Sequence, residues 1–165
     1  MSEPARVRRD ARSPTLSSRS AEPEEADALS ALAFRSKAYW GYDAEFLEAC
    51  RSELTLTAEF IAAGEVHLIE KGKGAIGFYS LVQWNSDVEL GHFFVEPGCI
   101  RQGLGALLWN DAVERAVALG YGHLIIESDP NAEGFYIKLG AERIGEVPSR
   151  AQAGRFLPLL FFPLR

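Results

Sequence analysis

The segment Ile100-Arg101-Gln102-Gly103-Leu104-Gly105-Ala106-Leu107-Leu108 decides how this sequence is interpreted. It lies between an apolar stretch that ends near Val95 and a helix-periodic stretch that continues to Leu119. Glycines at 103 and 105 leave backbone N–H groups uncovered where that helix begins. Because the first N–H groups of a helix lack partners, and the helix dipole adds about half a positive charge there, the turn suits an anion such as a phosphate. The segment therefore predicts a phosphorylated ligand.

Spacing argues against two common phosphate-binding loops. A Walker loop needs Gly-Lys-Ser/Thr, and no lysine follows Gly105. The dinucleotide fingerprint G-x-G-x-x-G/A places its third small residue at Leu108, which is too bulky for close packing of a helix on a strand. The loop Pro97-Gly98-Cys99 also separates the strand from the glycines, whereas the fingerprint runs directly from strand into turn. A helix start without a ligand is the remaining structural alternative.

The composition indicates one globular domain. The chain has 165 residues, 47% of them hydrophobic, which suffices for a sizeable core. No apolar run approaches the ~20 residues of a membrane span, and no apolar segment of a secretory signal follows the arginine-rich start. Cys50 and Cys99 fit no metal-binding spacing. These features predict a cytoplasmic protein without a metal or a membrane partner.

The charge is unevenly distributed. The net charge of −6 argues against a nucleic-acid partner. Within residues 1–13 four arginines outnumber Glu3 and Asp10, which leaves +2 there and −8 over the remainder. We therefore predict a disordered basic tail at 1–13 and a folded domain at 14–165, which must hold an anion with local donors.

Apolar periodicity and turn residues predict the element order β-α-α-β-β-β-α-β-α-β-β. The predicted elements are a strand at 14–19, helices at 23–40 and 43–50, strands at 65–70, 75–84 and 88–95, a helix at 103–119, a strand at 123–127, a helix at 131–139, and strands at 141–147 and 156–162. A strand–helix–strand crossover makes the strands at 88–95 and 123–127 parallel. The short turns between the strands at 65–70, 75–84 and 88–95 predict antiparallel hairpins. The expected class is α+β, a mixed sheet of six to seven strands with about four helices. Pro158 suggests an edge strand or a bulge.

With this order, the chain resembles the GNAT superfamily of acyl-CoA-dependent N-acyltransferases over essentially everything after residue 14. The loop Ile100–Gly105 is similar to the family's acyl-CoA loop, Q/R-x-x-G-x-G/A, except that its first position is Ile. Residues Asp129–Ala141 resemble the family's Asn-x-x-x-Phe-Tyr-x-x-Leu-Gly helix. The block Ser36–Tyr42 resembles a bacterial subset of the family.

The resemblance implies where acetyl-CoA binds. The strands at 88–95 and 123–127 would splay apart, and the pantetheine arm would lie between them and pair with the backbone as an added strand does. The diphosphate would contact N–H groups of the glycine loop. Asn131 would hydrogen-bond the arm, and its alternative role is to cap the following helix, which could hold at the same time. The implied contacts are Phe93, Phe94, Val95, Arg101, Gln102, Gly103, Leu104, Gly105, Ala106, Asn131 and Tyr136.

Acyl transfer from a thioester to an amine needs a neutral amine, a stabilised carbonyl oxygen and a proton for the departing thiolate. The resemblance implies Glu89 as the base, 14 positions before the first loop glycine. The alternatives are a solvated strand-end acid and His92 as the base, which strand alternation would place on the opposite face. Tyr136 is the predicted acid, since the neighbouring Phe135 and Leu139 should face the core. The oxyanion donor would be a backbone N–H near residue 94 or 95.

Other chemistry-bearing residues have ordinary interpretations. His67 and His123 stand singly in apolar strands, as core histidines do, and no metal site is predicted. Four aromatic residues could line an acceptor pocket or belong to the core: Tyr39, Trp40, Tyr42 and Phe46.

The sequence thus predicts an N-acetyltransferase that moves an acetyl group from acetyl-CoA directly to a primary amine, either a small molecule or an amino-acid-like amine. A protein or peptide amine is the alternative acceptor. A non-catalytic acyl-CoA-binding sensor or interaction module is the alternative function. The apolar strand at 156–162 leaves a homodimer open.

Overall fold

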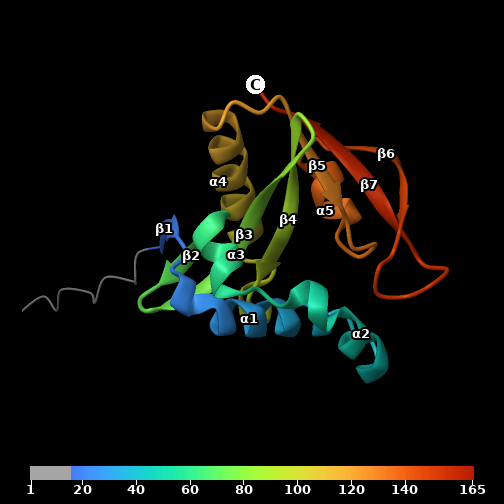
Figure 1. The fold of residues 1–165 in the computed structure, drawn as a ribbon, viewed down its shortest axis with the longest axis horizontal. Coiled ribbons are helices and arrows are strands. Elements are labelled where there is room, and N and C mark those ends of the chain that lie inside the picture. The colour runs from blue at the N-terminus through green and yellow to red at the C-terminus, as the bar shows by residue number, and fades with distance from the viewer. Residues whose placement is uncertain (1–15) are drawn as a thin grey trace, which may run out of the picture.

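The computed structural model describes residues 16–165, so the predicted tail and the first two residues of the strand predicted at 14–19 lie outside the described residues. The elements (Figure 1) are β1 (Leu16–Ser20), a 3-10 turn (Pro23–Glu25), α1 (Ala26–Ala38), α2 (Ala44–Leu54), α3 (Ala58–Ala63), β2 (Glu65–Lys71), β3 (Gly74–Trp84), β4 (Asp87–Val95), a 3-10 turn (Pro97–Cys99), α4 (Leu104–Ala118), β5 (His123–Glu127), α5 (Glu133–Lys138), β6 (Glu142–Pro148) and β7 (Phe156–Pro163).

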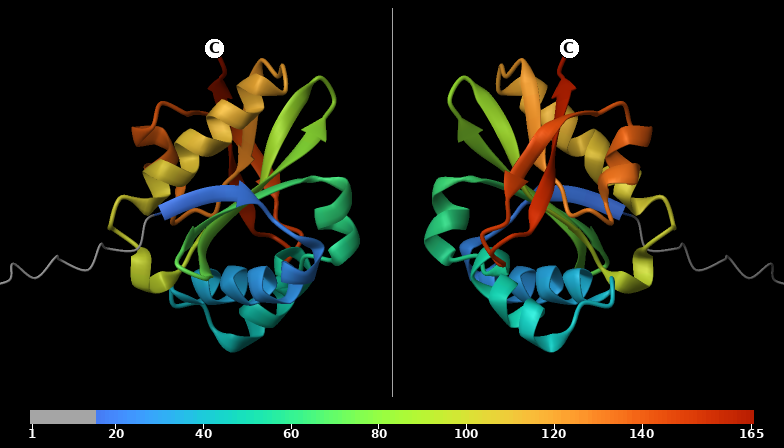
Figure 2. Two further views of the ribbon diagram at one scale, coloured as in Figure 1. Left: turned by 90° about the vertical axis from the view of Figure 1, so that its left-hand side faces the viewer. Right: turned by 90° about the vertical axis from the view of Figure 1, so that its right-hand side faces the viewer.

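The strands form one seven-stranded sheet in the order β1-β2-β3-β4-β5-β7-β6. All neighbouring strands are antiparallel except β4 and β5, which are parallel because they are joined by the crossover through α4. α4 covers one face of the sheet and α1 lies against the other, as the two views of Figure 2 show. This arrangement confirms the predicted α+β class with a mixed sheet.

Each face of the sheet has its own apolar core. Leu104 and Leu108 of α4 are 4% and 0% exposed and pack on one face, and Leu29 and Leu32 of α1 are 0% and 1% exposed and pack on the other. Burial of one such side chain contributes roughly 1.5–3 kcal/mol. Because Leu104 lies in the first turn of α4, this packing also fixes the glycine loop at the end of β4.

Two helices differ from the prediction. Only Ile61 is buried among the six residues of α3, so the sequence has no apolar periodicity from which this helix could be predicted. Its one local signal is Thr57, whose hydroxyl oxygen accepts the Phe60 N–H at 3.1 Å. α5 begins at residue 133 with Ala132 as its N-cap, so the alternative in which Asn131 caps this helix is wrong.

The strand β7 lies inside the sheet, between β5 and β6. The interpretation of Pro158 as an edge or bulge residue is therefore wrong, and the register shift between β6 and β7 lies at Ile144 instead. Pro158 has no N–H to continue the ladder, and the residues of β7 that pair with β5 begin at the next position, Leu159. Since β5 and β6 cover β7 within one chain, its apolar sequence gives no support to a homodimer.

A gap opens between β4 and β5. These strands are paired only at Val88–Leu124 and Glu89–Ile125. Beyond Glu89, β4 continues to Val95 with β3 as its partner, and β5 continues with β7 as its partner. The parallel strands therefore diverge from Glu89 onward, as the resemblance implies, and the edge of residues 90–95 that faces β5 is left without a partner among the described strands.

A β-bulge at Gly91 changes which side chains of β4 face this gap. The register of β4 against β3 shifts by one residue there. As a result Leu90 and Phe93, three positions apart, both pack toward α4. Glu89 and His92 consequently share the opposite face and line one cavity, so the prediction that they point to opposite faces is wrong.

Gly91→Ala is expected to destabilise the protein by about 1–3 kcal/mol. An added Cβ would lie 2.8 Å from Oγ of Ser80 and 3.1 Å from Cγ2 of Val82, so the bulge would have to shift. Chemical denaturation measures the effect. Gly74→Ala is the control, because a Cβ there meets no atom within 4 Å. Equal denaturation midpoints for the two variants would show that the bulge accepts a side chain.

Candidate active site

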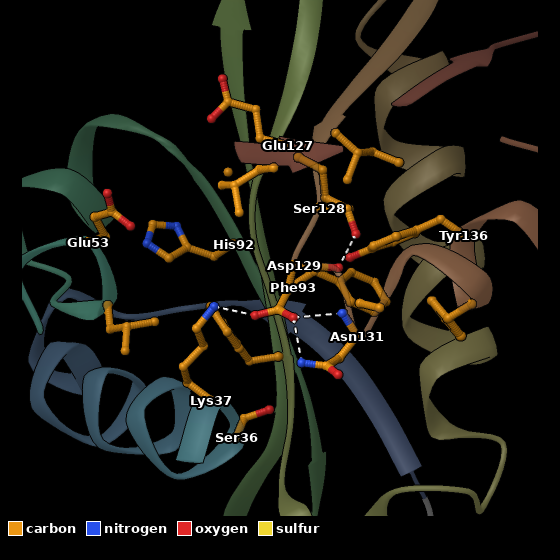
Figure 3. A pocket seen from close by; sticks show the side chains of 18 of the residues that line it. Ser36, Lys37, Glu53, His92, Phe93, Glu127, Ser128, Asp129, Asn131 and Tyr136 are labelled. Carbon is orange, nitrogen blue, oxygen red and sulfur yellow. Dashed lines mark hydrogen bonds and ion pairs between the residues drawn. The ribbon is translucent and has the colours of Figure 1, made fainter. Parts of the chain in front are cut away.

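A cavity of about 710 Å³ lies where β4 and β5 diverge (Figure 3). Its walls come from the loop before α4, from both strands beside the gap, from α1 and α2, and from the segment between β6 and β7. The volume falls within the range of ligand pockets, about 300–1,000 Å³. One cavity therefore reaches from the glycine loop to the residues that α2 and the β6–β7 segment place on the other side of the gap.

The loop before α4 has the backbone conformation of an anion-binding turn. The φ angles of Arg101 and Gly103 are 67° and 81°, both left-handed. When residues with left-handed φ angles alternate with residues of negative φ, successive backbone N–H groups point toward the same side of the turn. A left-handed residue other than glycine is uncommon, and such conformations cluster at functional sites. Arg101, Gly103, Gly105 and Ala106 all line the cavity.

Three residues of the loop have more specific roles than the sequence indicates. Gln102 turns back onto the loop, where its Nε2 donates to the carbonyl oxygen of Gly98 at 3.0 Å. The side chain of Leu104 is buried in the core, so only its main chain can contact a ligand. At Gly105 an added Cβ would lie 3.1 Å from the ring of Phe135, so glycine there also lets α5 pack closely against α4.

Glu89 lies where the gap opens. Its side chain lines the cavity, and no described residue hydrogen-bonds to its carboxylate. Burial raises the pKa of this carboxyl group above its usual value, the negative charge of Glu127 raises it further, and Arg150 partly opposes the shift. A carboxylate with a raised pKa and free oxygens is suited to take a proton from an amine.

His92 lines the same cavity, but its ring is engaged. Its Nδ1 lies 2.7 Å from Oγ of Ser80. Burial lowers the pKa of the imidazole, and a hydrogen bond to the main chain of Glu53 only partly opposes this. The contact with Ser80 occupies one ring nitrogen, and the lowered pKa disfavours protonation of the ring. The geometry therefore favours Glu89 over His92 as a proton acceptor.

Tyr136 presents its hydroxyl to the cavity while its ring belongs to the core. The residue is 5% exposed, and its ring packs against Phe93 and Trp109 with centroids 5.8 and 5.7 Å away. The hydroxyl has no hydrogen-bond partner among the described residues. Burial, and then the negative charge of Asp129, raise the pKa of this phenol. It therefore stays protonated at neutral pH and can act as a donor.

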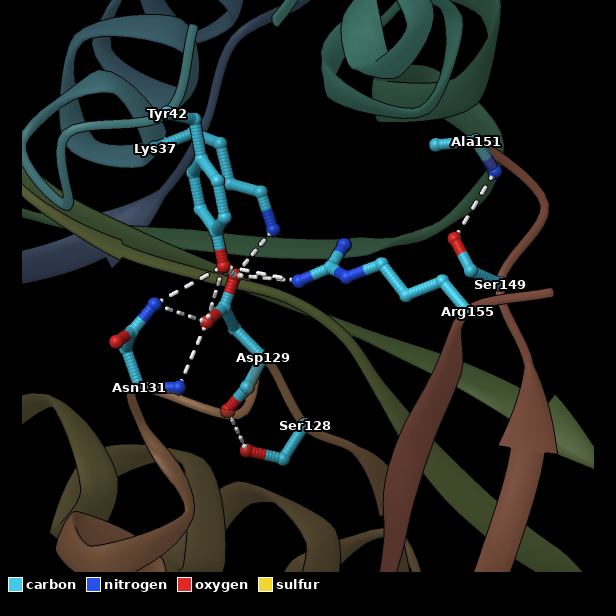
Figure 4. Close-up of polar contacts among 8 residues, drawn as sticks. All are labelled: Lys37, Tyr42, Ser128, Asp129, Asn131, Ser149, Ala151 and Arg155. Atoms are coloured by element: carbon cyan, nitrogen blue, oxygen red, sulfur yellow. Dashed lines mark hydrogen bonds and ion pairs between the residues drawn. The ribbon is translucent and has the colours of Figure 1, made fainter. Parts of the chain in front are cut away.

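A polar cluster that sequence reasoning missed borders the same cavity (Figure 4). We call it the Asp129 cluster: Lys37, Tyr42, Asp129, Asn131 and Arg155. Its Asp129 carboxylate forms an ion pair with Nζ of Lys37 and accepts the Tyr42 hydroxyl at 2.9 Å, and Arg155 Nη2 lies 3.9 Å away. Burial alone would raise the pKa of Asp129, but the charge of Lys37 and the hydrogen bonds hold it below its usual value. The members are up to 118 positions apart in sequence, so no spacing rule connects them.

The four aromatic residues that follow α1 lie in different environments. Tyr39 and Trp40 are 45% and 42% exposed, and Trp40 lines the cavity. The rings of Tyr42 and Phe46 pack 4.5 Å apart beside the Asp129 cluster. The pocket-lining alternative therefore holds for Trp40, whereas Phe46 packs against the core on the α1 face of the sheet.

The remaining predictions concern histidines, metals and membranes. His67 is 9% exposed and pairs with Glu65 at 2.7 Å, as expected for a core histidine. The same prediction is wrong for His123, whose side chain is 46% exposed and lies 3.0 Å from Asp87. Within residues 16–165, no three metal-binding side chains of His, Cys, Asp or Glu come together. None of the helices in that range combines the length and apolarity that crossing a bilayer would require.

Comparison with known proteins agrees with this fold. The family model described as "Acetyltransferase (GNAT) domain" matches residues 21–158. No curated protein matches the sequence.

Three solved structures illustrate the structural similarity. The PaiA N-acetyltransferase of Thermoplasma acidophilum, solved in complex with coenzyme A, is 16% identical with a TM-score of 0.74, over 90% of this chain and 99% of that one. A GCN5-related N-acetyltransferase of Rhodopseudomonas palustris is 20% identical with a TM-score of 0.71, over 92% and 96%. The ribosomal-protein-S18-alanine N-acetyltransferase of Escherichia coli is 15% identical with a TM-score of 0.67, over 91% and 94%.

At these identities the solved structures support the fold, whereas the family model covers most of the chain and includes both the glycine loop and the α5 motif. The chain belongs to the GNAT family and is an acetyl-CoA-dependent N-acetyltransferase.

Proposed function

We propose that this acetyltransferase transfers the acetyl group of acetyl-CoA directly to a small primary amine, with Glu89 as the base and Tyr136 as the acid. The observation that carries the proposal is that one cavity reaches from the glycine loop to both side chains. Acetyl-CoA supplies the acetyl group as a thioester, whose cleavage releases the coenzyme A thiol.

The chain offers a continuous set of groups for the acyl-CoA. The N–H groups of residues 101–106 bind the diphosphate, which the left-handed conformations of Arg101 and Gly103 support. The free edge of Phe93–Val95 pairs with the pantetheine arm as an added strand would. Asn131 borders the arm from the β5–α5 loop.

Glu89 takes the proton that the acceptor must lose. An alkylammonium has a pKa near ~10 and is mostly charged at pH 7, so its nitrogen cannot attack until it is deprotonated. Glu89 accepts that proton directly or through one water, for which its raised pKa and its place at the opening of the gap are suited. The neutral nitrogen can then bond to the acetyl carbon.

Tyr136 and the main chain of β4 complete the transfer. As the carbon–nitrogen bond forms and the carbon–sulfur bond breaks, Tyr136 donates its phenolic proton to the sulfur. The nitrogen then loses its second proton through water to the tyrosinate, and Glu89 releases the first proton to solvent, which restores both side chains. A backbone N–H near Phe94 or Val95 stabilises the negative charge that develops on the carbonyl oxygen. No covalent bond to the protein is needed.

The dimensions of the cavity favour a small or amino-acid-like amine over a protein. Its volume of about 710 Å³ must hold the acyl arm as well as the acceptor. The acceptor would lie beyond Glu89, where Glu53, Phe60 and residues 148–151 line the wall. A peptide N-terminus is the alternative acceptor.

Turnover with a defined amine panel tests the proposal. Purified protein is incubated with acetyl-CoA and a set of small amines, amino acids and short peptides, and thiol release and product mass are measured. Steady thiol release with an acetylated small amine supports the proposal. Tight binding of acetyl-CoA without turnover on any amine contradicts it and favours the sensor, whereas turnover of peptides alone contradicts the small acceptor.

A further inference from the structure

Asp129 joins four segments of the chain at one partly buried carboxylate (Figure 4). Its side chain is only 13% exposed. Lys37 reaches it from α1, Tyr42 from the loop between α1 and α2, and Arg155 from the segment before β7. Asn131, in the same loop as Asp129, donates its main-chain N–H to Oδ1 at 2.8 Å. The carboxylate therefore connects both walls of the gap.

The hydrogen bonds around Asp129 determine how the Asn131 amide is oriented. Nδ2 of Asn131 donates to Oδ1 of Asp129 at 3.1 Å and to the Tyr42 hydroxyl oxygen at 2.9 Å. An ionised carboxylate can only accept, so the amide must turn its NH₂ group toward Asp129. Both amide hydrogens are then used, and Oδ1 of Asn131 is left as an acceptor at a residue that lines the cavity.

Tyr42 makes this orientation more rigid. Its hydroxyl donates to Asp129 and accepts from both Asn131 and Arg155, each at 2.9 Å. The bonds to Asp129 and Arg155 are partly buried, so water replaces them less readily than it would on the surface. The same carboxylate also lies close enough to Tyr136 for its charge to favour the protonated phenol.

We propose that Asp129 is a positioning residue for acetyl transfer. Through Tyr42 and its own carboxylate it fixes the β5–α5 loop, so that Oδ1 of Asn131 accepts an amide N–H of the pantetheine arm and the following helix holds Tyr136 beside the sulfur. This inference rests on the proposed function, since it assigns Asp129 a role in the same site.

The test compares Asp129→Asn with Asp111→Asn. Asp111 is a matched control because it also accepts a tyrosine hydroxyl, that of Tyr79 at 2.6 Å, but it belongs to α4, on the other face of the sheet. Coenzyme A affinity is measured by calorimetry and kcat/KM by thiol release, with a thermal melt for each variant. Asp129→Asn is expected to lower both the coenzyme A affinity and kcat/KM by about 10-fold or more. A misplacement of the order of 1 Å can reduce rates about 100-fold. Asp111→Asn is expected to lower only the melting temperature.

A double-mutant cycle separates positioning from a general loss of structure. If Asp129 acts through Asn131, Asp129→Asn should weaken coenzyme A binding much less in an Asn131→Ala background than in the wild type. Tyr42→Phe leaves every charge in place and should reproduce part of the loss caused by Asp129→Asn. If Asp129→Asn does not fold, Tyr42→Phe takes its place in the cycle.

Two results would overturn the inference: wild-type coenzyme A affinity in Asp129→Asn or Tyr42→Phe, or the same loss with and without Asn131. Because coenzyme A binding needs no acceptor, it tests Asp129 even if no amine is acetylated. Absence of turnover in the wild type would instead contradict the proposed function.

Discussion

Glu89→Gln is expected to lower kcat/KM by about 10²–10⁴-fold, the usual contribution of a general base. Glutamine keeps the shape of the side chain but cannot take a proton from the acceptor. The fold should survive, because no described residue hydrogen-bonds to the Glu89 carboxylate. Initial rates of thiol release at saturating acetyl-CoA measure the effect.

The pH profile provides a second test of the same residue. The base must be ionised to act, so kcat/KM should fall as the pH drops through the pKa of Glu89, which burial and Glu127 raise above the ordinary value of 4.5. Glu127→Gln removes the neighbouring negative charge, so it should lower the pKa of Glu89 and move this limb to lower pH. Wild-type rates for Glu89→Gln, with the acid limb unchanged, would exclude Glu89 as the base and would reopen the case for His92.

Tyr136→Phe is expected to reduce kcat by about 10-fold to 10³-fold, because the departing thiolate would lose its proton donor. The KM for acetyl-CoA should change little, since the hydroxyl acts mainly as the carbon–sulfur bond breaks. Stability should be preserved, because the ring supplies the packing and the hydroxyl bonds to no described residue.

The control for this variant is Tyr79→Phe. Tyr79 is fully buried, and its hydroxyl donates to Asp111 away from the cavity. Loss of the Tyr79 hydroxyl should lower the melting temperature and leave kcat unchanged, which is the reverse of the pattern expected for Tyr136→Phe. If the two variants lost kcat equally, or if Tyr136→Phe kept the full rate, Tyr136 would not be the acid.

Local sequence signals predicted most of this fold. The order of the main elements and the parallel pair β4–β5 followed from three features: the glycines at 103 and 105, the apolar pattern of the strands, and the strand–helix–strand crossover. These features act over a few residues, so they can be recognised without knowing the tertiary structure. α3 lacked such a signal, because a helix of six residues with one buried side chain has no apolar period.

Errors arose where a distant contact decides the structure. The bulge at Gly91 depends on the close approach of Ser80 and Val82, and it reverses the relation between Glu89 and His92 that simple alternation predicts. The interior position of β7 depends on which strand pairs with β5, which its own apolar sequence does not specify.

The site was predicted only in part, for the same reason. The motifs at 100–105 and 129–141 pointed to residues that line one cavity. The Asp129 cluster could not be predicted, because Lys37, Tyr42 and Arg155 meet Asp129 only in the folded chain. A basic tail at 1–13, a domain at 14–165 and a cytoplasmic location remain proposals from composition alone.

A crystal structure of the protein with coenzyme A tests the central claim most directly. We expect the diphosphate on the N–H groups of residues 101–106 and the pantetheine arm between β4 and β5. The sulfur should lie next to the Tyr136 hydroxyl, and Oδ1 of Asn131 should accept a hydrogen bond from the arm. A coenzyme A bound elsewhere, or a gap that stays closed while the nucleotide lies on the surface, would contradict it.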